Sequence, residues 1–295
     1  MPYAIIDTYP SFREYWERVK ARSIDEQIKA WETDYMSRYP QLFKLQVEGY
    51  EDMGVDWRKI AREKVFPKLP SLLPFIEEAW RNLREVVPRA FSKFNGFWER
   101  EFNVVFVLYV GIGCGAGWAT EYCERYAVLL GLENIAELGW HKARELEGLV
   151  LHELSHIAHM ALRRVSPKEF EALEASPFFL LYSEGFATRC EHLILGREDW
   201  RIASDSSWLE WCRENIVFLA SEYLRRVERG EPINDFYGSW LNIKGRSQTG
   251  YYLGHEFIKS LEEDMDLEEI ATMSVKEVES RVKAFLEQRV TGKAN

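Results

Sequence analysis

The sequence predicts an α+β fold that is mostly helical, with a small mixed sheet near the middle of the chain. Apolar residues recur at spacings of three and four over much of the 295 residues, which is the helical period. A run rich in β-branched and aromatic residues over 102–110 indicates a buried strand. No alternation of strands and helices repeats along the chain, which argues against a doubly wound parallel sheet.

The first hundred residues are expected to be mainly helical. The prolines over 67–74 predict a break before a helix over 75–87. Apolar positions that fit packed amphipathic helices are Trp16, Val19, Ile24, Ile28 and Trp31.

A glycine-rich segment, GIGCGAGWAT, follows the strand over 102–110 and precedes a second expected strand over 126–130. Its glycines either let a substrate backbone approach closely or form bulges and turns. Gly111-x-Gly113-x-x-Ala116 loosely fits a dinucleotide-binding fingerprint, but the glycines that follow would interrupt the helix that such a motif must open. Glu133 is expected to make a polar contact or to lie in a solvated turn.

Residues 152–156 spell H-E-x-x-H. On a helix, His152 and His156 share one face and can direct two imidazoles at one metal ion. Glu153 lies beside them, where it can take a proton from a water bound to that metal. The pattern therefore predicts a metal site with a general base.

The surrounding sequence favours a helix for this motif. Apolar residues from Arg144 onward keep the helical period, and Pro167 limits its continuation. His159 is roughly 10 Å along the helix axis from His152, too far for both to bind one zinc together with His156. We expect His159 to support the site or to lie in the core. The His and Gly that continue a metzincin motif are absent.

A third candidate ligand follows in FFLLYSEGFA, residues 178–187. Ser176 and Pro177 resemble a helix start, so Glu184 would lie in the second or third turn. A carboxylate within such an apolar run is costly to bury unless it is paired or bound to a metal.

The motif and the segment S-E-G-F-A together resemble the gluzincins, zinc peptidases that combine HExxH with a glutamate from a following helix. The resemblance implies zinc bound by His152, His156 and Glu184, with Glu153 as general base. It also implies a zincin-like catalytic core, with a small mixed sheet before the HExxH helix and a helical C-terminal lobe.

One position departs from the family pattern. Many gluzincins carry an aspartate four residues after the ligand glutamate, where it orients the first histidine, and this chain has Thr188 there. A hydroxyl is a weaker acceptor than a carboxylate, so another group would orient His152. Glu191 and Glu147 are both candidates.

The segment TGYYLGHEFI, residues 249–258, resembles a Y-x-x-G helix start of related predicted proteases. The resemblance implies Tyr251 as the group that stabilises the oxyanion, with Tyr252 and His255 as alternatives. Arg246 could bind a substrate carboxylate. Before this segment we expect a long helix over 208–229 and a loop over 230–250, and after it an acidic helical end.

Composition restricts the partners. The net charge of −10 argues against nucleic acid, and no apolar run reaches the roughly 20 residues needed to span a membrane. The N-terminus lacks a signal-like segment, which favours a cytoplasmic protein. The four cysteines of the chain form no C-x-x-C pair and are expected to be free thiols. A disulfide between Cys190 and Cys212 remains an alternative.

The sequence thus predicts a cytoplasmic zinc peptidase acting on a peptide or protein substrate. Its expected parts are a helical region over 1–100, the sheet and HExxH helix over 101–165, and a helical lobe over 166–295. Two alternatives share the motif: a zinc amidohydrolase with a non-peptide substrate, and a non-catalytic helical binding protein. The oligomeric state is left open.

Overall fold

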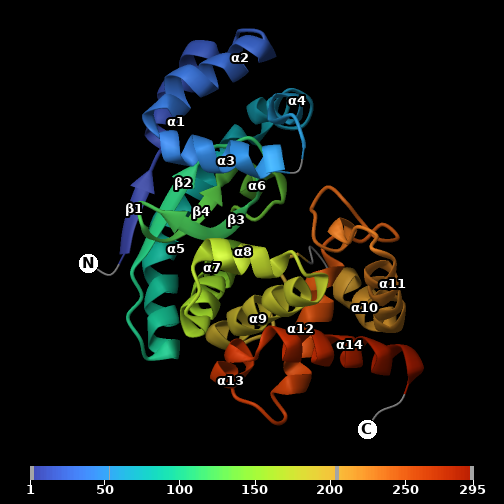
Figure 1. The fold of residues 1–295 in the computed structure, drawn as a ribbon. Coiled ribbons are helices and arrows are strands. Elements are labelled where there is room, and N and C mark those ends of the chain that lie inside the picture. Colours follow the sequence, from blue (N-terminus) through green and yellow to red (C-terminus); the bar gives the residue numbers. More distant parts are fainter. Residues whose placement is uncertain (1–2, 53, 203–205, 293–295) are drawn as a thin grey trace. The chain divides into compact units, whose positions relative to one another are not determined.

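The computed structural model describes residues 3–52, 54–202 and 206–292. They form two compact units, residues 1–153 and 154–295, and the division falls within one long helix, α7 (Ala143–Arg163). The expected α+β class is confirmed, because the chain is mostly helical with one small mixed sheet (Figure 1).

The sheet of the first unit has four strands in the order β1-β2-β4-β3. The strands are β1 (Tyr3–Asp7), β2 (Val104–Tyr109), β3 (Gly117–Tyr122) and β4 (Arg125–Gly131). β1 and β4 pair in parallel with β2, whereas β3 pairs antiparallel with β4. The two strands expected from the sequence are therefore confirmed as β2 and β4.

The strands β1 and β3 are additions that the sequence did not reveal. Every residue of β2 is buried, which produces the continuous apolar run that marked it. β1 and β3 are the edge strands, and most of their residues are only half-buried. Their sequences therefore lack a strong strand pattern, and their pairing is decided by contacts with β2 and β4.

Helices surround this sheet in the first unit. They are α1 (Tyr9–Val19), α2 (Ile24–Ala30), α3 (Pro40–Asp52), α4 (Trp57–Ile60), α5 (Leu69–Trp98) and α6 (Leu132–Glu137). Phe91 of α5 packs against Phe106 of β2, with ring centroids 6.0 Å apart. Trp31 is fully buried, and its indole N–H donates to the Val110 carbonyl at 3.1 Å. Of the apolar positions expected to pack in these helices, Ile24 is half-buried, and the buried ones are Trp16, Val19, Ile28 and Trp31.

The prolines at the start of α5 do not break it where the sequence suggested. Pro70 occupies the first turn, where its missing N–H costs nothing. Pro74 and Pro88 lie inside a continuous helix of 30 residues. The expected break before residue 75 is therefore wrong. Burial of a long apolar face, including Ile76, Leu83 and Phe94, offsets the lost backbone hydrogen bonds.

The second unit is helical in all its described residues apart from turns, a 3₁₀ turn over Asn234–Phe236 and one isolated bridge. After α7 come α8 (Pro167–Glu174), α9 (Pro177–Leu195), α10 (Ser206–Glu214), α11 (Ile216–Arg229), α12 (Thr249–Leu261), α13 (Leu267–Thr272) and α14 (Val275–Thr291). The single helix expected over 208–229 is interrupted at Asn215, whose side-chain amide donates to the Trp211 carbonyl at 2.9 Å. That side chain competes with helix continuation.

The helices α9 and α12 approach each other through two glycines. A Cβ on Gly185 would lie 2.3 Å from the backbone of Gly254, and a Cβ on Gly254 would lie 2.4 Å from the Leu181 carbonyl oxygen. Backbone atoms cannot yield to such overlaps, so only glycine fits at either position.

All four cysteines are free, so no Cys190–Cys212 bridge is present. Among the helices that the structure describes, none is both long and apolar enough to cross a membrane.

Adding one methyl group at the α9–α12 contact should destabilise the protein. We expect Gly254→Ala and Gly185→Ala each to lower the free energy of unfolding by about 1–3 kcal/mol, because the helices must separate. Gly49→Ala is the control: Gly49 is exposed within α3 with nothing near its Cβ position, so alanine should stabilise by about 0.5–1 kcal/mol. Urea unfolding measures the free energy of unfolding of all three variants. Equal changes at the contact glycines and at Gly49 would contradict the packing argument.

Candidate metal centre

The H-E-x-x-H motif lies within α7, as the sequence predicts. His152, Glu153 and His156 are 3%, 6% and 8% exposed, so the motif is largely removed from water. One helical turn separates the two histidines, which places them on the same face.

Glu184 comes from α9, which begins at Pro177 after Ser176 as expected. Its Oε2 lies 3.4 Å from Nε2 of His156. One ligand atom from each of His152, His156 and Glu184 lies within 4.8 Å of the others. The structure thus brings together the three residues that the sequence singled out.

This donor set fits a divalent metal ion. Tetrahedral ligands at bonds of about 2.0–2.2 Å are separated by about 3.4 Å, as the His156 and Glu184 atoms are. Two imidazole nitrogens and one carboxylate oxygen form a common catalytic zinc set, which leaves a fourth position for water or substrate.

Glu153 lies against the start of the edge strand β3. A Cβ on Gly117, the first residue of that strand, would be 2.7 Å from Glu153 Oε1. The glycine therefore lets the carboxylate lie directly on the strand backbone. The expectation for this segment was the close approach of a substrate backbone or the formation of bulges and turns, whereas at Gly117 it is the Glu153 side chain that comes close.

Two other glycines of that segment bind a buried carboxylate. The backbone N–H groups of Gly111 and Gly113 donate to Glu133 at 2.7 and 3.1 Å, and Glu133 is 2% exposed. A solvated position for Glu133 is therefore wrong, whereas the expected polar contact is present. The glycines are followed by the strand β3, whereas a dinucleotide-binding motif would be followed by a helix. Burial raises the pKa of Glu133 to about 7, although both hydrogen bonds favour its ionised form.

Tyr251 lies in the first turn of α12 and is half-buried. Its ring meets the ring of Tyr237 edge-on, with centroids 5.8 Å apart. Tyr252 is 5% exposed and packs on Trp200, so its surroundings are those of a core residue. Arg246 is half-buried and donates to Ser207 Oγ at 3.2 Å.

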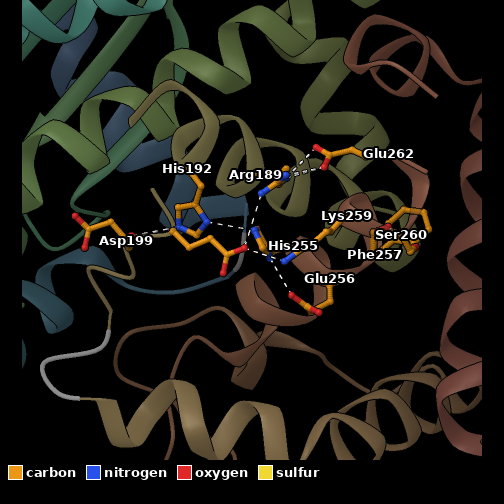
Figure 2. A network of polar contacts seen from close by, with 10 residues as sticks. Arg189, His192, Asp199, His255, Glu256, Phe257, Lys259, Ser260 and Glu262 are labelled. Atoms are coloured by element: carbon orange, nitrogen blue, oxygen red, sulfur yellow. Dashed lines mark hydrogen bonds and ion pairs between the residues drawn. The ribbon is translucent and has the colours of Figure 1, made fainter. Parts of the chain in front are cut away.

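His255, the third alternative to Tyr251, is fully buried in the polar network of Figure 2. His192 Nε2 donates to the Asp199 carbonyl at 3.2 Å, so its Nδ1 accepts from His255 Nε2, also at 3.2 Å. His255 Nδ1 contacts a carboxylate oxygen of Glu256 at 3.1 Å. Burial lowers the pKa of His192 to about 4, which keeps it neutral. His255 is thus bound on both nitrogens within the helix packing.

The residues considered for orienting His152 each have another partner as well. Glu147 contacts Arg89 at 3.1 Å and Lys93 at 2.9 Å. Glu191 forms a buried ion pair with Arg201. The Thr188 hydroxyl donates to the backbone carbonyl of Glu184 at 2.8 Å, and so fixes a turn of α9.

His159 lies in the core. It is fully buried, and its Nε2 donates to the Tyr182 hydroxyl at 3.0 Å, because that hydroxyl itself donates to the Ile270 carbonyl. Its ring packs on Phe170 and Phe186 at centroid distances of 4.9 and 4.4 Å. Burial in this aromatic surrounding holds its pKa well below the usual value.

Sequence reasoning missed one further carboxylate near the cluster. Glu174, the last residue of α8, accepts from Ser183 Oγ at 2.6 Å. Burial raises its pKa to about 7; the Glu184 carboxylate adds to this effect, whereas His156 opposes it. The residue ends an ordinary amphipathic helix, and no local pattern marks it.

Comparison of the chain with protein-family profiles, with curated proteins and with solved structures finds no significant match.

The buried Glu133 should make stability depend on pH. Its folded-state pKa of about 7 exceeds the ordinary 4.5, so its contribution is fully present below pH 4.5 and is lost as the pH rises towards 7. The loss should be roughly 3 kcal/mol, to order of magnitude. Urea unfolding across this range should show a flatter profile for Glu133→Gln, while Glu63→Gln, an exposed residue, should follow the unchanged protein. Parallel profiles for all three would contradict the assignment.

The cluster should bind one zinc ion per chain. Removing a ligand costs more than removing a supporting hydrogen bond, which already weakens metal binding about 10–100-fold. We therefore expect His156→Ala and Glu184→Ala to weaken zinc binding by at least roughly 100-fold. Elemental analysis after dialysis measures the loss, with Glu171→Ala on the exposed face of α8 as the matched control. Retention of zinc by Glu184→Ala would require a different third ligand.

Proposed function

We propose that the protein is a zinc-dependent peptidase of the gluzincin type. The observation that supports this most is the convergence of His152, His156 and Glu184 from two helices, with their ligand atoms within 4.8 Å of one another. Glu153, next to the first ligand in the helix, supplies a carboxylate that is not part of the metal-binding set.

A zinc ion bound to these residues supplies a Lewis acid that polarises a carbonyl and makes water more acidic. Glu153 takes the proton of the attacking water and passes it to the leaving amine. Its position against Gly117 limits the directions in which its carboxylate can point. A general base held in one orientation loses little entropy on reaching the transition state.

The oxyanion that forms on the carbonyl needs a donor. Tyr251 suits this role, because it is half-buried at the start of α12 and retains some exposed surface. Tyr252 and His255 are more deeply buried, and His255 is engaged on both ring nitrogens. We therefore favour Tyr251 among the three.

The strand β3 offers a further support for a peptide substrate. It is an edge strand whose one paired neighbour is β4, and its first residue touches Glu153. A peptide added to such an edge would be held by backbone hydrogen bonds, independently of its side chains.

Glu153→Gln separates metal binding from catalysis. The variant should keep one zinc per chain, whereas kcat/KM for peptide cleavage should fall by about 10²–10⁴ because the general base is lost. Casein and a peptide library, followed by mass spectrometry, provide the substrates. Cleavage of small non-peptide amides but no peptide would indicate an amidohydrolase. Failure of the unchanged, zinc-loaded protein to cleave either would refute the proposal.

A further inference from the structure

The outer edge of strand β3 presents backbone groups that can be assigned residue by residue. The Gly131 N–H donates to the Ala116 carbonyl at 3.0 Å, directly before β3, and the antiparallel register of β3 with β4 continues from this pair. In an antiparallel ladder, every second residue directs its N–H and C=O at the same neighbouring strand. Ala116 faces β4, so the groups of Gly117, Ala119 and Glu121 point away from β4.

These outward groups are available for a further strand. β3 is the last strand of the sheet on its side. Among the described residues, none forms a hydrogen bond with the outward N–H and C=O groups of Gly117, Ala119 and Glu121. At about 3.3 Å per residue, they form a row of donors and acceptors roughly 13 Å long. An extended peptide can pair with all of them.

One end of this row lies at the proposed general base. A Cβ on Gly117 would be 2.7 Å from Oε1 and 2.8 Å from Cγ of Glu153. The peptide bond to be cleaved must be within reach of this carboxylate, because Glu153 takes the proton of the attacking water. A substrate strand on this edge therefore has its scissile bond near Gly117 and extends past Ala119 towards Glu121.

The other end of the row carries a negative charge. Glu121 is exposed, and its carboxylate forms no ion pair with any residue that the structure describes. Side chains directly opposite each other in an antiparallel pair lie on the same face, with Cβ atoms about 4.5–5.5 Å apart. A substrate side chain opposite Glu121 would therefore lie next to a carboxylate whose charge is not neutralised.

The direction of the substrate decides which of its residues meets Glu121. Antiparallel pairing is the more stable arrangement and lets each outward residue of β3 exchange two hydrogen bonds with one substrate residue. Because β3 runs from Gly117 to Glu121, an antiparallel substrate has its amino side at Glu121. We propose that Glu121 makes the site selective for peptides with lysine or arginine about four residues to the amino side of the cleaved bond. This inference rests on the proposed peptidase function.

The test uses peptides that differ only at this position, which carries lysine, glutamine or glutamate. For the unchanged protein, we expect kcat/KM to be about two- to fivefold higher for lysine than for glutamine, the effect of one cross-strand ion pair, and lowest for glutamate. Glu121→Gln should remove the preference, and Glu121→Lys should reverse it. The preference should also disappear at about 1 M salt, where the Debye length is about 3 Å.

Glu124→Lys is the matched control. Glu124 is also exposed but lies in the turn after β3, and its substitution changes the net charge by the same amount. It should leave the lysine preference unchanged. Zinc content and the unfolding midpoint show whether each variant is folded and loaded.

Backbone methylation of the substrate tests the pairing itself. Methylating the nitrogen of the residue opposite Ala119 should lower kcat/KM by about three- to tenfold, because one hydrogen bond is lost. Methylating the nitrogen of the next residue should have a smaller effect, because that nitrogen points away from β3.

An unchanged lysine preference in Glu121→Lys, or an equal shift in Glu124→Lys, would overturn the inference. A preference for lysine on the carboxyl side of the cleaved bond would also overturn it. If the unchanged protein cleaves peptides without any preference at this position, only this inference fails. If it cleaves no peptide, the proposed function fails, and this inference with it.

Discussion

The contact between α9 and α12 at Gly185 and Gly254 is the constraint on which the second unit depends. Each glycine leaves room for the backbone of the other helix, at distances that no side chain would permit. Glu184 directly precedes Gly185, and Tyr251 lies one turn before Gly254. The close helix approach therefore sets the spacing between a candidate metal ligand and a candidate oxyanion donor. The glycines of both motifs thus have a packing reason that is independent of any family resemblance.

Buried carboxylates are the second feature that unites the structure, and they are stabilised in different ways. Glu133 accepts hydrogen bonds from two backbone N–H groups of the glycine-rich loop, so its buried carboxylate has hydrogen-bond partners in an apolar interior. Glu184 and Glu174 instead lie near His156, and the charge of Glu184 adds to the burial that raises the pKa of Glu174. The negative charges of two such acids would be relieved by a divalent cation.

The contact between α9 and α12 has a buried hydrogen-bond network at one end and partly exposed tyrosines at the other. Beyond the glycine contact, His192 and His255 join the two helices through a buried hydrogen bond (Figure 2). Such a network rigidifies the packing because both ring nitrogens of each histidine have a partner. Tyr251 and Tyr237, by contrast, keep part of their surface exposed at the start of α12. A rigid network next to partly exposed tyrosines is what a preorganised site requires.

The sequence by itself determined those features that local periodicity encodes. The helix carrying His152 and His156, the buried strand β2 and the start of α9 at Pro177 all follow from patterns within a few turns. The tertiary structure decided the rest, because it depends on contacts between distant residues. The pairing of Tyr3 with Val104 makes the segment Tyr3–Asp7 a strand, although its own sequence has no strong strand pattern. The approach of Glu184 to His156 and the burial of Glu133 depend in the same way on partners that no local pattern specifies.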